Sequence, residues 1–158
     1  MHLSSSLEQL EAEPLIREGL SQHLGGITLE PRKLTLPHGA RVDIDAASSD
    51  DSVLVEIHAH QGRLRGGQFG KVARDALKLI TLSRTRPTSK LILAFADEDA
   101  AGCVHGRSWL AEAVKAWGIE VVVVPLDQNV RDGLRAAQVR QVMVNPPLNN
   151  DAAESATV

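Results

Sequence analysis

The fold is decided by the stretch RVDIDAASSDDSVLVEIHAHQG, residues 41–62. Apolar and polar residues alternate on both sides of the polar run SSDD, which predicts two β-strands joined by a tight turn. Each strand carries a carboxylate where an apolar side chain is expected, Asp43 in the first and Glu56 in the second. Because alternate residues of a strand share a face, His58 lies on the same side as Glu56. In the obvious hairpin register, Asp43 is expected near both of them.

The segments around this hairpin predict helices and further strands. Residues 4–26 begin with a serine cluster and end in two glycines, which predicts one helix or two pieces broken near Pro14. The segment 27–36 alternates as a strand, and Pro31 within it indicates an edge position or a bulge. Later patterns predict helices over 68–85, 106–118 and 129–143 and strands over 90–96 and 119–126. The fold class expected is α/β, a mixed central sheet flanked by helices.

Length and composition predict one globular domain. The chain has 158 residues, 43% of them hydrophobic and 23% charged, which excludes a disordered chain and leaves room for a substantial core. We expect a single domain over residues 1–145 and a flexible polar tail over 146–158. The single cysteine, Cys103, excludes an internal disulfide framework and a multi-cysteine zinc site.

The sequence offers no signal for export or for membrane insertion. The first residues lack a basic start followed by an apolar run, and the most apolar stretch, GIEVVVVPL, has the length of a strand. By elimination we expect a cytoplasmic protein without a membrane partner.

Charge is distributed unevenly along the chain. Residues 58–90 carry eight basic side chains and one acidic one, although the whole chain has a net charge of −3. A basic segment directly after the carboxylate hairpin favours a polyanion as partner, and DNA above all. The candidate nucleic-acid-binding residues are Arg63, Arg65, Gln68, Lys71, Arg74 and Lys78.

Three of these candidates share a helix face. Lys71, Arg74 and Lys78 recur at i, i+3 and i+7 in the helix expected over 68–85. An ordinary solvated helix face would give the same spacing, so the two interpretations stay open. Because the chain has only two Trp, two Phe and no Tyr, we expect contact with the DNA backbone and not base stacking.

The paired carboxylates predict a metal site. Two carboxylates as close as Asp43 and Glu56 repel each other unless a cation lies between them. Oxygen ligands favour Mg²⁺, Mn²⁺ or Ca²⁺ over zinc. Two exposed surface carboxylates are the alternative, but Leu54 on the same face indicates at least partial burial.

The order of elements and the spacing of these residues resemble the PD-(D/E)XK superfamily of restriction-endonuclease-like nucleases. Glu56 lies thirteen residues after Asp43, and His58 follows it with one residue between them. The expected αβββαβ order of elements covers roughly residues 7–125. The resemblance implies that Asp43 and Glu56 are metal ligands, assisted by an acidic residue of the first helix, Glu18 or Glu11.

The same resemblance implies an activity and partners. The expected reaction is Mg²⁺- or Mn²⁺-dependent hydrolysis of phosphodiester bonds in DNA, within a defence, restriction or repair system. A homodimer or a larger nuclease assembly would supply a second active site.

One departure from the family concerns catalysis. Histidine occupies position 58, where the family has lysine, and its ordinary pKa lies far below that of lysine. Lys71 on the following helix is the candidate for a relocated lysine. The expected catalytic residues are therefore Asp43, Glu56, His58 and Lys71. The alternative is a catalytically inactive, nuclease-like scaffold that binds DNA or a partner protein.

Other motifs carry less weight. His58 and His60, with His38 or His105, could form a zinc site, but this spacing is common. The stretch RGGQFGK fails the P-loop pattern, because Arg65 stands where its first glycine should be. We interpret Asp45, Asp50 and Asp51 as turn and solvent residues. The run DED at 97–99 ends a strand and is either turn chemistry or an extra acidic ligand, and turn chemistry is favoured.

Overall fold

The structure is a computed structural model that describes residues 6–87 and 89–144, so the tail expected over 146–158 lies outside the described residues. Helices and strands follow the order α1 (Leu7–His23), β1 (Glu30–Thr35), β2 (Arg41–Ala47), β3 (Val53–His58), α2 (Gly67–Ser83), β4 (Lys90–Phe95), α3 (Glu98–His105), α4 (Trp109–Ala116), β5 (Glu120–Val123) and α5 (Gln128–Val144). None of the described helices is long and apolar enough to cross a membrane.

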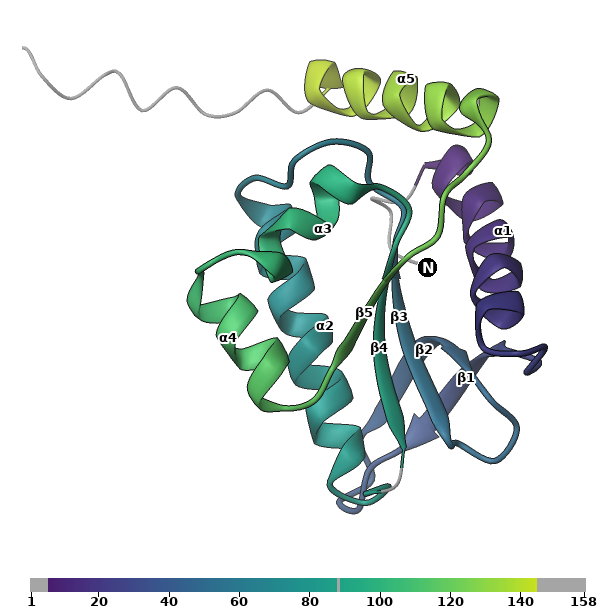
Figure 1. Cartoon of the computed structure of the whole chain (residues 1–158), viewed down its shortest axis with the longest axis vertical. Coiled ribbons are helices and arrows are strands. Elements are labelled where there is room, and N and C mark those ends of the chain that lie inside the picture. Colours follow the sequence, from purple (N-terminus) through teal and green to yellow (C-terminus); the bar gives the residue numbers. More distant parts are fainter. Residues whose placement is uncertain (1–5, 88, 145–158) are drawn as a thin grey trace, which may run out of the picture.

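The strands form one open, mixed sheet in the order β1-β2-β3-β4-β5. The pairs β1–β2 and β2–β3 are antiparallel, whereas β3–β4 and β4–β5 are parallel. Helices α2, α3 and α4 cover one face, while α1 covers the other and α5 crosses the end of the sheet (Figure 1). The prediction of an α/β fold with a mixed sheet between helices is confirmed at this level.

The first helix is continuous. The Ser6 hydroxyl accepts a hydrogen bond from the Gln9 amide at 3.2 Å, and the Gln9 side chain accepts one from the Ser6 amide at 3.1 Å. Pro14 lies inside the helix without ending it. Of the two alternatives expected for this segment, one helix is therefore correct, because the capping box and the packing of its apolar face outweigh one missing amide.

A β-bulge interrupts the pairing of β1 with β2. Ala47 pairs with Glu30 and Ile44 pairs with Arg32, so two residues of β2 lie opposite Pro31 alone. Proline has no amide hydrogen to donate, and β1 lies at the edge of the sheet. The prediction of an edge position or a bulge at Pro31 is confirmed.

The central strands β2 and β3 separate toward one end. Their backbone pairs are Ala46 with Val55 and Ala47 with Leu54, and β2 then diverges from β3. We call the region beyond the Ala46–Val55 pair, between Asp45 on β2 and Glu56 on β3, the fork. At the fork, side chains take over hydrogen bonds that a regular antiparallel ladder would make with backbone groups.

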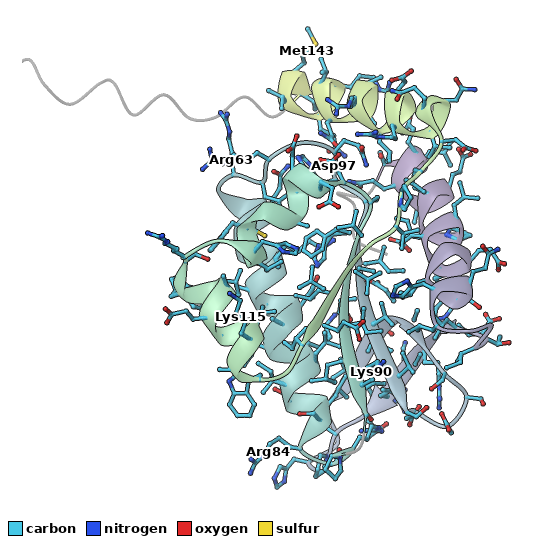
Figure 2. All side chains as sticks on the ribbon, viewed as in Figure 1. Arg63, Arg84, Lys90, Asp97, Lys115 and Met143 are labelled. Atoms are coloured by element: carbon cyan, nitrogen blue, oxygen red, sulfur yellow. The ribbon has the colours of Figure 1, made fainter. Side chains whose placement is uncertain are left out.

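Asp97 ties three segments together at the carboxyl end of β4 (Figure 2). Its carboxylate accepts hydrogen bonds from the Gly62 amide at 2.9 Å, from the Ala100 amide at 3.3 Å and from the Arg131 guanidinium at 3.0 Å. The loop after β3, the start of α3 and the helix α5 therefore share one buried anchor.

The same residue explains a helix that the sequence did not predict. Asp97 is the N-cap of α3, and Glu98 and Asp99 in its first turn interact favourably with the helix dipole. Interpreting the run DED as turn chemistry was therefore wrong. The helix has only eight residues and contains a glycine, so its periodicity was too short to recognise.

We predict that Asp97→Ala lowers the free energy of unfolding by about 2–4 kcal/mol, because an N-cap and a charge-assisted hydrogen bond are both lost. Urea unfolding followed by circular dichroism measures the change. Asp99→Ala, which removes an exposed carboxylate two residues later, is the control and should cost about 0.5 kcal/mol or less. Equal losses in the two variants would contradict the anchoring role of Asp97.

Candidate functional site

Asp45 bridges the two strands of the fork. Its Oδ2 accepts a hydrogen bond from the Ile57 amide at 2.8 Å, and the side chain is half-buried. The carboxylate therefore satisfies an amide that the diverging β2 backbone leaves without a ladder partner. The interpretation of Asp45 as a turn or solvent residue was wrong, whereas Asp50 and Asp51 do lie in the hairpin turn.

Asp43 lies outside this constellation. Its side chain is 82% exposed, and one of its oxygens is 3.6 Å from the Lys33 ammonium on β1. The bulge explains this position, because one extra residue changes the face toward which each preceding residue of β2 points. Ile44 consequently packs in the same core cluster as Leu54, and Asp43 turns to the opposite face. The structure does not bring the Asp43 carboxylate together with Glu56 and His58.

Glu56 carries a carboxylate inside the protein. It is 2% exposed, and its Oε1 accepts a hydrogen bond from the Lys78 ammonium at 3.0 Å. Burial, followed by repulsion from Asp45 and Asp75, raises the pKa of Glu56 to about 9, and Lys78 counteracts only part of this shift. Acidic side chains are therefore gathered around Glu56 as expected, but the β2 residue among them is Asp45 and not Asp43.

Lys78 extends from α2 into the fork. Besides Glu56, its ammonium donates to the Asp43 carbonyl at 3.1 Å and lies 3.6 Å from an Asp75 oxygen. Burial lowers the pKa of Lys78, but the surrounding carboxylates outweigh this effect and the net pKa is raised. Lys78 is thus engaged in the fork, unlike the other basic candidates.

His58 and Asp75 face each other without forming a hydrogen bond. The His58 Nε2 and the Asp75 Oδ2 are 3.4 Å apart, both are buried, and within the described residues neither has a hydrogen-bond partner. The imidazole also stacks on Phe95, with ring centroids 5.1 Å apart. Burial, and then the charges of Lys71 and Lys78, lower the pKa of His58 to about 3. His58 is therefore neutral at physiological pH and does not reproduce the charge of a lysine.

The acidic residue that α1 brings toward the fork is Glu13. It is half-buried, and burial together with repulsion from Asp45 raises its pKa, against the attraction of Lys71 and Arg17. Glu18, the expected candidate, is exposed and accepts a hydrogen bond from Gln22 at 3.2 Å. The alternative, Glu11, is also exposed.

The basic candidates divide into two groups. Arg63, Arg65, Lys71 and Arg74 are exposed, and Lys71 lies close enough to the fork to influence the pKa values of His58, Asp75 and Glu13. Gln68 is within 3.1 Å of a ring nitrogen of His60. We call the four exposed basic side chains of the loop 63–66 and the first half of α2 the basic surface: Arg63, Arg65, Lys71 and Arg74.

The chemistry of the carboxylates suits a hard divalent cation. In residues 6–87 and 89–144 no group of three or more His, Cys, Asp or Glu side chains forms a ready metal site, and this includes the histidine combinations considered for zinc. Asp45, Glu56 and Asp75 nevertheless supply oxygen ligands that repel one another, and a cationic ammonium already lies against two of them. The carboxylate oxygens of Asp45 and Glu56 are donors of the type that Mg²⁺ and Mn²⁺ prefer.

Comparison of the chain with known protein families, with curated proteins and with solved structures finds no match. The assignment of a function therefore depends on the geometry of the fork and on the residues around it.

The buried Glu56 carboxylate makes stability depend on pH. A group whose pKa is raised in the folded state stabilises the fold fully below its unfolded value, here 4.5, and this contribution is lost as the pH rises toward about 9. Replacing Glu56 by Gln removes this loss. We expect the stability of Glu56→Gln relative to wild type to increase between pH 5 and pH 9 by on the order of 5 kcal/mol.

Urea unfolding at pH 5, 7 and 9 measures this difference. Asp43→Asn, which removes a surface carboxylate from the neighbouring strand, controls for the loss of one negative charge. A constant difference between Glu56→Gln and wild type across the pH range would show that Glu56 is not desolvated in the folded protein.

The pairing of Lys78 with Glu56 can be tested by a double-mutant cycle. Lys78→Met should destabilise the fold by about 2–3 kcal/mol, because it leaves two buried carboxylates without their cation. Arg74→Met, an exposed position on the same helix, should change stability by about 0.5 kcal/mol or less. Combining Lys78→Met with Glu56→Gln should recover most of the loss, and strict additivity would exclude a direct interaction.

Proposed function

We propose that this protein is a divalent-metal-dependent nuclease that hydrolyses phosphodiester bonds of DNA. The observation that carries the proposal is the buried Glu56 carboxylate at the fork, next to Asp45 and in contact with the Lys78 ammonium. Such a group costs stability, and strongly perturbed carboxylates that cluster with cations are typical of catalytic sites.

The arrangement of elements supports the same proposal. The order α1, β1, β2, β3, α2, β4 and the antiparallel-then-parallel sheet agree with the αβββαβ core of the restriction-endonuclease-like family. In that interpretation Asp45 and Glu56 would be the metal ligands, and Glu13 of α1 would take the assisting position that the sequence had suggested for Glu18 or Glu11. The family assignment belongs to the proposal.

A bound cation would polarise the phosphodiester and activate a water molecule for attack. The side chains around the fork would hold the cation and stabilise the charge that develops on the phosphate. Asp45 is held in place by the Ile57 amide, and Glu56 by Lys78, so neither carboxylate needs to reorganise before substrate binds. The negative charge that develops on the phosphate would be stabilised by the nearby lysines.

Lys78 is the better candidate for the relocated lysine. Its ammonium is fixed 3.0 Å from Glu56, whereas Lys71 is exposed and forms no ion pair among the described residues. Lys71 would contact the phosphates of the substrate together with Arg63, Arg65 and Arg74. His58 is neutral and would act as a positioning residue that packs between Phe95 and Asp75.

A catalytically inactive scaffold remains the second candidate. Two observations favour it: the described residues contain no ready group of three metal-ligating side chains, and the Lys78 ammonium already neutralises Glu56. In this case the basic surface would bind DNA, or the fold would bind a partner protein, without cleavage. A homodimer or larger assembly is compatible with either candidate.

Nuclease assays with matched aspartate variants distinguish the two. With plasmid and single-stranded DNA and Mg²⁺ or Mn²⁺, we expect cleavage by wild type and a loss of about 100-fold or more in Asp45→Asn and Glu56→Gln. Asp43→Asn, two residues from Asp45 on the same strand, should keep nearly full activity. His58→Asn should lower the rate less than Glu56→Gln does.

Two results would overturn the proposal. One is the absence of cleavage by wild type together with a melting temperature unchanged by either metal, which would establish the scaffold. The other is cleavage that survives in both Asp45→Asn and Glu56→Gln, which would assign the activity to a contaminating nuclease.

A further inference from the structure

One tryptophan lies exposed beside the basic surface. Trp109, the first residue of α4, is 67% exposed. Its ring meets Phe69 of α2 edge to face, with centroids 6.4 Å apart and an interplanar angle of 78°. Phe69 packs against the core cluster beneath α2, so it holds the indole beside this helix. The structure therefore presents a large aromatic face to solvent in a defined position.

The segment that carries Phe69, the partner of this ring, is basic. From residue 61 to residue 74 the chain contains no acidic residue, and its four basic side chains are exposed. Arg63 projects outward from the loop between β3 and α2 (Figure 2). Arg107, two residues before Trp109, is exposed as well, and the acid that follows on α4 is Glu112, about one turn away. This combination of an aromatic face and positive charge complements a nucleic acid strand.

The start of α2 is open for a phosphate backbone. A side chain at Gly66, Gly67 or Gly70 would meet no atom within 4 Å, so the space above these glycines is free. Gly66, the N-cap, provides no side-chain hydrogen bond to the first turn. Because no side chain fills this space, a phosphate can approach the backbone of the turn closely, with Arg65 and Lys71 as its neighbours in the sequence.

We propose that Trp109 is a stacking platform for an unpaired nucleobase, and that the strand carrying this base crosses the first turn of α2 toward the fork. The inference rests on the proposed function for its class of ligand and adds that the substrate is single-stranded or has a splayed end. In a duplex each base is already stacked on its neighbours, so its face is not available to an indole. The scarcity of aromatics had predicted backbone contact alone.

The path across α2 follows from helix geometry. Phe69 and Lys78 are nine residues apart, which at about 100° per residue places them on opposite sides of the helix. A strand in contact with both Trp109 and the fork must therefore pass over or around a helix about 10 Å wide. The strand can cross most easily at the N-terminal end of α2, where Gly66, Gly67 and Gly70 carry no side chains. Arg65 and Lys71 flank these glycines in the sequence.

The chain provides a matched control for the experiment. It has two tryptophans and no tyrosine, and Trp117, at the other end of α4, is 53% exposed. Trp117→Phe therefore leaves Trp109 as the only strong fluorophore, and Trp109→Phe leaves Trp117. Each variant reports on one ring in an otherwise unchanged protein.

The first measurement is fluorescence quenching without metal, so that no cleavage is needed. The probes are twelve-nucleotide oligo-dT and oligo-rU, a fully paired DNA hairpin, and polyphosphate, which has charge without bases. We expect oligo-dT or oligo-rU to quench Trp109 in the Trp117→Phe variant, and the hairpin and polyphosphate to quench it little. Trp117 in the Trp109→Phe variant should respond to none of them. Comparing oligo-dT with oligo-rU shows whether the base is presented by DNA or by RNA.

The second measurement is the affinity for the same oligonucleotides by anisotropy. Trp109→Ala should weaken single-strand binding about 5- to 100-fold, Trp109→Phe should retain most of it, and Trp117→Ala should not change it. Equal affinities of Trp109→Ala and Trp117→Ala overturn the inference, as does quenching by polyphosphate as strong as that by oligo-dT. Either result leaves the nuclease proposal intact, because that proposal depends on metal-dependent cleavage by wild type and on its loss in Glu56→Gln and Asp45→Asn.

Discussion

The arrangement of the fork depends on a backbone constraint at the sheet edge. Pro31 of β1 has no amide hydrogen, and β2 places two residues opposite it. Because of that extra residue, the side chains of β2 before the bulge point to the opposite face of the sheet from the one that regular alternation predicts. At the same place β2 stops pairing with β3. Asp45 then reaches the Ile57 amide, and Lys78 fills the space beside Glu56. The charged cluster is thus a consequence of local strand geometry as much as of side-chain chemistry.

Keeping such a cluster inside a small domain opposes stability. Desolvation raises the pKa values of Glu56 and Asp75 and lowers that of His58, and the unpaired His58 Nε2 and Asp75 Oδ2 add a further cost. The aliphatic clusters on both faces of the sheet supply the opposing free energy. A fold that tolerates this cost in its central strand retains charge where an apolar side chain would pack more favourably, which is the pattern of a functional site.

Much of the fold could be predicted from the sequence, but the composition of the site could not. Alternation located the hairpin, and Pro31 indicated the bulge. Regular alternation along the whole strand predicted Asp43 as the carboxylate of β2 that approaches Glu56. The bulge breaks that alternation and brings Asp45 to the fork instead.

Two further site residues carried a signal that could have been used. Asp75 occupies a buried position among Val72, Ala76 and Leu79, where the helical pattern calls for an apolar residue. Glu13 directly follows Ala12, which lies on the buried face of α1. The lowered pKa of His58 could not be predicted from the sequence. It depends on how deeply α2 buries the ring, and the sequence pattern does not give that depth.

The bulge also affects how this protein can change in evolution. Two acidic residues alternate in the stretch VDID, and a single extra backbone unit decides which of them serves the interior. In a regular strand these two aspartates would share a face, because alternate residues do. The bulge spans Asp45 and Ala46, so it separates Asp45 from Asp43 and leaves only one of them beside Glu56. A substitution that restored regular pairing would therefore move an acid to another face without altering either carboxylate.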